Sequence, residues 1–81
     1  MTIQILKTYL YGKEINGEIV FFDDEVIEEK NITHNNEVVE MIKKCDELRR
    51  QYGSKDIKSW KYNYIGEDEK GKYTFVTKYV R

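Results

Sequence analysis

A nucleophilic pair is the first chemistry to test, because the chain contains one histidine and one cysteine, His34 and Cys45. Such a pair needs the thiol and the imidazole within hydrogen-bonding distance. Cys45 falls on the apolar stripe of a predicted helix, where a buried, unreactive thiol is usual. One cysteine and one histidine also match no standard spacing of zinc ligands. We therefore expect no catalytic residues, no metal site and no cofactor, and a protein that is not an enzyme.

A cluster of carboxylates follows in the segment DDEVIEE. Its members are Asp23, Asp24, Glu25, Glu28 and Glu29. Carboxylates bind Mg²⁺ and Ca²⁺, but a calcium loop alternates its oxygen ligands around a central glycine, which this segment lacks. The sequence EEK at its end imitates part of a nuclease motif, but that match is short and common by chance. We interpret the cluster as a charged surface.

The last 24 residues, KSWKYNYIGEDEKGKYTFVTKYVR, combine six aromatic side chains with lysines and an arginine. One interpretation is a platform for single-stranded nucleic acid, with bases stacked on rings and phosphates held by lysines. That platform would comprise Lys58, Trp60, Lys61, Tyr62, Lys72 and Lys78. The other interpretation is a core, because large rings recur on one face of each predicted strand. We favour the core and keep the nucleic-acid platform as the alternative.

Two strands and a tight turn are predicted to position the acidic cluster. TIQILKTYLYGKEI is rich in β-branched and aromatic residues, and Asn16-Gly17 is the commonest two-residue hairpin turn. With that turn, Ile15 faces Glu18 and Lys13 faces Val20 across the hairpin. The following segment, DDEVIEEKNI, either prolongs the second strand through a bulge or forms an acidic connection.

A helix is predicted from about residue 36 to residue 52. Its apolar side chains recur every three or four residues and form one stripe. The stripe consists of Val38, Met41, Ile42, Cys45, Leu48 and Tyr52. A second pair of strands, DIKSWKYNYIG and KYTFVTKYV, follows around the turn EDEKG. The fold class is therefore α+β: residues 1–81 form a single compact ββαββ domain, with a mainly antiparallel four-stranded sheet and one helix packed on one face.

Charge is unevenly distributed, although the net charge is only −1. Residues 13–32 contain seven acidic and two basic side chains, a net charge of −5, whereas residues 54–81 contain four acidic and seven basic ones, a net charge of +3. The balanced total argues against a dedicated duplex-DNA binder and against a DNA mimic. The chain shows no signal peptide and no membrane-spanning run, so we expect a cytoplasmic protein without membrane contact.

With one helix for a two-sided sheet, a half-apolar sheet face is left uncovered. This face either binds a partner or is covered by a coiled strand or by the stems of Lys and Arg side chains. The candidate partner-binding residues are Leu10, Ile19, Phe21, Asp23, Asp24, Glu25, Glu28, Glu29, Val76 and Val80. We expect a protein-binding module of inhibitor or adaptor type, whose partner is a larger protein or a second copy of the chain. Its size and lack of catalytic groups are typical of phage and other mobile-element proteins that act on host machinery.

Overall fold

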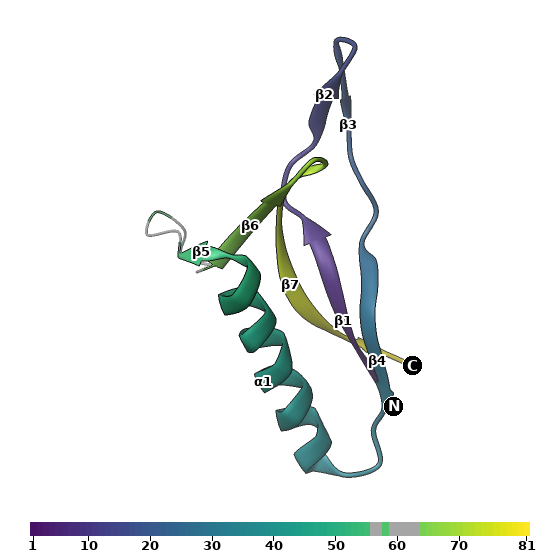
Figure 1. Cartoon of the computed structure of the whole chain (residues 1–81). Coiled ribbons are helices and arrows are strands. Elements are labelled where there is room, and N and C mark those ends of the chain that lie inside the picture. The colour runs from purple at the N-terminus through teal and green to yellow at the C-terminus, as the bar shows by residue number, and fades with distance from the viewer. Residues whose placement is uncertain (56–57, 59–63) are drawn as a thin grey trace.

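The computed structural model describes residues 1–55, 58 and 64–81. One helix packs against a mainly antiparallel sheet, which confirms the predicted α+β fold class (Figure 1). The main sheet has five strands in the order β4-β1-β7-β6-β5, and β2 and β3 form a separate two-stranded ribbon. The strands are β1 Thr2–Tyr9, β2 Lys13–Ile15, β3 Glu18–Val20, β4 Glu25–Asn31, β5 Ser54–Lys55, β6 Tyr64–Asp68 and β7 Gly71–Val80, and the helix is α1 Asn35–Tyr52.

The strand count exceeds the expected four because the first predicted strand is divided into two, the acidic segment forms β4, and the short β5 follows the helix. β1 ends at Tyr9 and lies between β4 and β7, whereas β2 begins at Lys13 and pairs only with β3. The acidic segment forms a strand, as the first of its two predicted courses has it, but β4 is separate from β3 and pairs antiparallel with β1 in the main sheet. The register of that pair shifts between Ile5 and Leu6, where Glu28 and Val26 are the partners, so one residue of β4 bulges.

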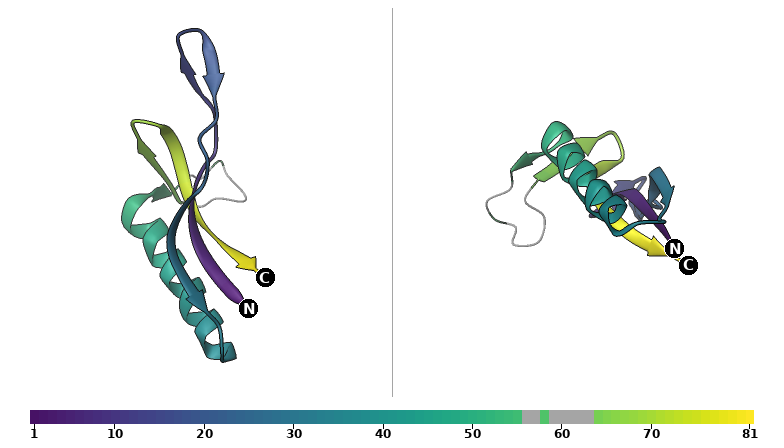
Figure 2. Two further views of the ribbon diagram at one scale, coloured as in Figure 1. Left: turned by 90° about the vertical axis from the view of Figure 1, so that its right-hand side faces the viewer. Right: turned by 90° about the horizontal axis from the view of Figure 1, so that it is seen from below.

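The helix covers one face of the sheet, as Figure 2 shows in two turned views. The predicted stripe supplies its contacts, because Met41 and Cys45 are buried and Val38 and Leu48 pack around them. The other buried members of the core come from the two central strands and are Ile3, Ile5, Tyr73 and Phe75. The core therefore sits between α1 and the β1–β7 pair, which are joined over eight residue pairs.

A row of aromatic rings continues the core along the helix-covered face. The row runs Phe22, Tyr9, Tyr73, Phe75, Tyr52, with successive ring centroids 5.8, 6.0, 5.7 and 6.0 Å apart. Edge-on and tilted contacts at these distances are favourable between rings. Tyr73 and Phe75 are thus core residues, as the favoured interpretation of the C-terminal segment predicts.

The prediction for the other aromatic residues of the C-terminal segment is only partly tested. Tyr79, expected on the same ring-bearing face as Tyr73 and Phe75, is 55% exposed. Trp60 and Tyr62 lie outside the described residues, and Tyr64 is partly buried at the start of β6.

The sheet face away from the helix is more closed than the sequence predicts. Leu6 and Thr74 point to this face and are nevertheless buried. Val76 and Val80 lie on the same face and are partly exposed. The expected half-apolar open face is therefore reduced to patches, and the most exposed apolar side chains lie elsewhere.

Candidate functional site

The two most exposed apolar side chains, Phe21 and Ile19, lie on the β2–β3 ribbon and the residue that follows it. We call this ribbon with its flanking residues, 12–21, the arm. The arm projects beyond the main sheet (Figure 1), and every residue of its two strands is exposed. Asn16 and Gly17 have φ values of 53° and 81°, the left-handed pair that a type I′ turn requires. Lys13 pairs with Val20 and Ile15 with Glu18, so the predicted register is confirmed.

Ile19 and Phe21 form the apolar face of the arm. They are 68% and 76% exposed, and two-residue spacing places them on the same side of β3 and its extension. Both side chains lie over Gly12 on the opposite chain of the ribbon. A Cβ at position 12 would overlap Ile19 Cγ2 and lie 3.1 Å from Phe21 Cε1. Gly12 therefore lets this pair lie flat against the arm.

Contacts at its base hold the arm to the main sheet. Phe22 points away from Phe21, packs on Tyr9 and carries the Lys70 ammonium 5.5 Å from its ring centroid. The Lys13 ammonium donates to the carbonyl of Glu69 in the β6–β7 turn. A groove of about 370 Å³ remains between the arm and this turn, lined by residues 11–14, 67–69 and 71–72. The base is thus anchored, while Phe21 is left in solvent.

The structure separates the acidic cluster into two groups. Glu28 lies 2.5 Å from Lys44 Nζ on the helix, and Glu29 accepts a hydrogen bond from Gln4 Nε2 at 2.7 Å. Those two carboxylates are used within the fold. Asp23, Asp24 and Glu25 are exposed, and no ion pair to them occurs within residues 1–55 and 64–81. They begin two residues after Phe21 and form an acidic margin beside the apolar face of the arm.

The other predicted partner-binding residues do not join this site. Leu10 is partly buried where its amide donates to the Lys72 carbonyl at 2.9 Å. Val76 and Val80 belong to β7 in the main sheet, whereas Ile19 and Phe21 belong to the separate arm. Sequence analysis placed them on one face because it treated β1 and β2 as a single strand.

A polar cluster that the sequence did not predict lies beside Tyr9 and Tyr73 of the ring row. Asp68 Oδ2 is 2.6 Å from Lys7 Nζ and accepts a hydrogen bond from the Tyr9 hydroxyl at 2.7 Å. The Lys7 ammonium lies 4.1 Å from the centroid of the Tyr73 ring, a cation–π distance. Lys7 and Asp68 are 61 positions apart in the chain, and neither has a local signal that would indicate the pair.

These contacts shift the ionisation of all three groups. Burial by itself lowers the pKa of Lys7, but the hydrogen bonds to Asp68 and Tyr9 and the negative charge of Asp68 raise it above its ordinary value. Burial, together with the hydrogen bond to Asp68, raises the pKa of Tyr9. A lysine held in its charged form is a poor base, which argues against a catalytic role for the cluster. Its role is structural, because it joins β1 to the start of the β6–β7 turn.

The residues of the alternative nucleic-acid platform are only partly described. Lys58, Lys72 and Lys78 are exposed, while Trp60, Lys61 and Tyr62 lie outside the described residues. Among the described rings of the C-terminal segment, Tyr73 and Phe75 are buried under the helix and cannot stack on bases. The platform therefore has exposed lysines but loses two of the rings that suggested it.

Cys45 and His34 are not neighbours. Cys45 is buried in the core, where burial raises the pKa of its thiol, and His34 is exposed at the start of the helix. Eleven helical positions separate them by roughly 16 Å along the axis. Within the described ranges, no three His, Cys, Asp or Glu side chains gather closely enough to hold a metal ion.

Comparison of the chain with models of known protein families, with curated proteins and with solved structures finds no match. The only helix in the described part of the chain, α1, is not long and apolar enough to cross a membrane. The geometry of the arm and its acidic margin is therefore the basis for a functional proposal.

Proposed function

We propose that this chain is a small, non-enzymatic protein-binding module of inhibitor or adaptor type. It docks on a larger protein through the arm. The observation that carries the proposal is the exposure of Phe21 and Ile19 on a projecting ribbon, beside a margin of three exposed carboxylates.

The energetic argument starts from the cost of leaving these side chains in water. Fully burying a side chain of this kind contributes about 1.5–3 kcal/mol. The neighbouring Phe22 packs on the Tyr9 ring, and both of these rings are partly buried. No ring of the described residues packs on Phe21, and its flat arrangement over Gly12 presents the ring as an anchor for a pocket on another protein.

The acidic margin defines the second requirement on the partner. Asp23, Asp24 and Glu25 would meet basic side chains around that pocket, because complementary charges at an interface rim steer association. The proposed partner therefore presents an apolar pocket with a basic margin. Host machinery that handles nucleic acid carries many such basic surfaces, in agreement with a mobile-element inhibitor.

The test is affinity capture with the tagged full chain in its native cellular context, with and without nuclease, followed by mass spectrometry. Three variants are compared with the wild type: Phe21→Asp, Gly12→Ala and Ile15→Asp. Ile15 is the matched control, since it lies on the opposite face of the same arm and is also exposed. Circular dichroism establishes that each variant is folded.

We expect one stoichiometric protein that survives nuclease and is retained by wild type and Ile15→Asp. Phe21→Asp should lose it, and Gly12→Ala should weaken it because the new methyl group displaces Ile19. A folded Phe21→Asp variant that captures the same protein normally would refute the proposal. Loss of all bound material after nuclease would favour the nucleic-acid alternative, and recovery of the chain alone as a dimer would favour self-association.

A further inference from the structure

The second half of β7 has a strand on one side only, as far as residues 1–55 and 64–81 show. β1 accompanies β7 as far as Val80, but β6 pairs with it only from Gly71 to Tyr73. Beyond that point the Thr74 hydroxyl donates a hydrogen bond to the Tyr64 carbonyl at 3.2 Å, in place of a backbone hydrogen bond between the two strands. From Phe75 onward, the outer edge of β7 has no strand partner within the described part of the chain.

Two hydrogen bonds establish which backbone groups face this edge. The Lys72 carbonyl accepts the Leu10 amide, so even-numbered residues of β7 direct their backbone groups toward β1. The Phe75 carbonyl instead accepts Arg49 Nε of the helix at 2.6 Å, as expected for a group directed outward. Because the direction alternates along a strand, the N–H and C=O groups of Thr77 and Tyr79 also face the outer edge.

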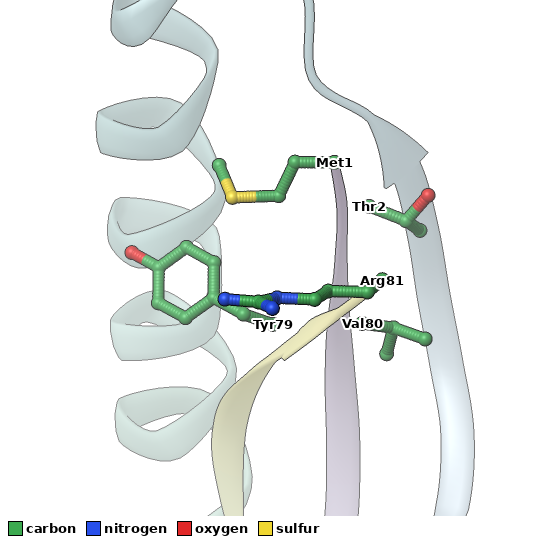
Figure 3. Close-up of a pocket in the computed structure, with 5 residues that line it drawn as sticks. All are labelled: Met1, Thr2, Tyr79, Val80 and Arg81. Atoms are coloured by element: carbon green, nitrogen blue, oxygen red, sulfur yellow. The ribbon is translucent and has the colours of Figure 1, made fainter.

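A recess with apolar walls lies at the end of the same strand. Its volume is about 720 Å³, and it is lined by Met1, Thr2, Tyr79, Val80 and Arg81. Figure 3 shows the Tyr79 ring and the Met1 side chain on the side toward the helix, with the Arg81 guanidinium between the two strand ends and the ring. Met1 and Tyr79 are both exposed, so this end of the sheet can receive apolar side chains.

The charge of the strand restricts what could pair with it. Residues 71–81 contain three basic side chains, Lys72, Lys78 and Arg81, and no acidic one. Lys78 lies on the face away from the helix and Tyr79 on the face toward it, because neighbours alternate. An added strand would therefore place apolar residues beside Tyr79 and acidic residues beside Lys78.

We propose that the outer edge of β7, from Phe75 to Val80, binds an extended acidic segment of a partner protein by strand addition. The segment alternates apolar and acidic residues, with its apolar side chains toward the helix. Main-chain hydrogen bonds to Thr77 and Tyr79 provide the attachment, and Lys78 and Arg81 provide the selectivity for acid. This inference does not depend on the proposed function of the arm, which lies at the other end of the molecule (Figure 1).

The experiment uses ¹⁵N-labelled full chain and a blocked seven-residue peptide, EVEVEVE, with KVKVKVK as the matched control peptide. Amide spectra are recorded during titration, and hydrogen exchange is measured at saturation. We expect saturable shifts at Thr77 and Tyr79, slower exchange of these two amides, and binding of EVEVEVE at least tenfold tighter than of KVKVKVK.

Three variants locate the contact. Thr77→Pro removes an N–H that faces outward and spares the ladder with β1, so it should abolish binding in a folded protein. Lys78→Glu should weaken binding of EVEVEVE roughly fivefold to tenfold. Lys43→Glu, on the outer face of the helix, is the charge control and should leave it unchanged.

Several results would overturn the proposal. These are equal affinity for the two peptides, shifts that avoid Thr77 and Tyr79, and unchanged binding by a folded Thr77→Pro variant. Sedimentation showing a dimer whose interface protects the same amides would also overturn it, because the occupant of the edge would then be a second copy of this chain.

Discussion

The Lys7–Asp68 pair joins β1 to the β6–β7 turn, and its removal tests how the sheet is held together. Asp68 Oδ2 accepts hydrogen bonds from the Lys7 ammonium and the Tyr9 hydroxyl, and Oδ1 accepts one from the Lys70 amide at 2.8 Å. Burial raises the pKa of Asp68, but the hydrogen bonds from these three donors outweigh it and hold the pKa at about 2, below the ordinary 3.8.

The size of the effect follows from that shift. Nearly two pKa units correspond to about 2.5 kcal/mol. Because the Asp68 side chain is 28% exposed, solvent screens part of the interaction, and we expect about 1–2 kcal/mol. Folding lowers this pKa, so the stabilisation is fully present above the pKa of the unfolded chain, near 4, and is lost as the pH falls through about 2.

Urea unfolding of the wild type and Asp68→Asn, at pH 7 and at pH 2.5, measures this contribution. At pH 7 the free energy of unfolding of the variant should be about 1–2 kcal/mol lower than that of the wild type. At pH 2.5 this difference should be less than half as large. Asp23→Asn, which removes an exposed carboxylate, should show no such difference at either pH. An equal gap between the wild type and Asp68→Asn at both pH values would refute the assignment of the stabilisation to the ionised carboxylate.

Two further predictions concern the helix. Met41 is 2% exposed in the core, so Met41→Ala should lower the free energy of unfolding by about 2–5 kcal/mol, whereas Ile42→Ala, at a side chain 48% exposed, should cost less than about 1 kcal/mol in the same urea titration. The Thr33 hydroxyl donates to Glu37 at 2.7 Å and lowers the pKa of that carboxyl. Thr33→Val should therefore raise the Glu37 pKa in an NMR titration, and an unchanged value would contradict the hydrogen bond.

The sequence alone determined the features that depend on neighbouring residues. The start of the helix could be predicted to within one residue, because the three- and four-residue spacing of apolar side chains in α1 depends only on residues close together in the chain. The Asn16-Gly17 turn fixed the register of the arm, since positive φ at two adjacent positions leaves few alternatives. The opposite exposure of Phe21 and Phe22 also follows from strand alternation, although their neighbours do not.

The tertiary structure decided which of these elements meet. It placed β1 at the centre of the sheet, detached β2 and β3 as the arm, and ended the β6–β7 ladder at Tyr73. It also brought Lys7 to Asp68. These outcomes depend on contacts between residues far apart in the chain. The free energy of such contacts combines burial, hydrogen bonding and chain entropy over the whole fold. For that reason the sequence predicted Ile19 and Phe21 as a binding pair but placed them on the main sheet instead of the arm. The outer edge of β7, which has no strand partner beyond Tyr73 among the described residues, became visible only in the assembled sheet.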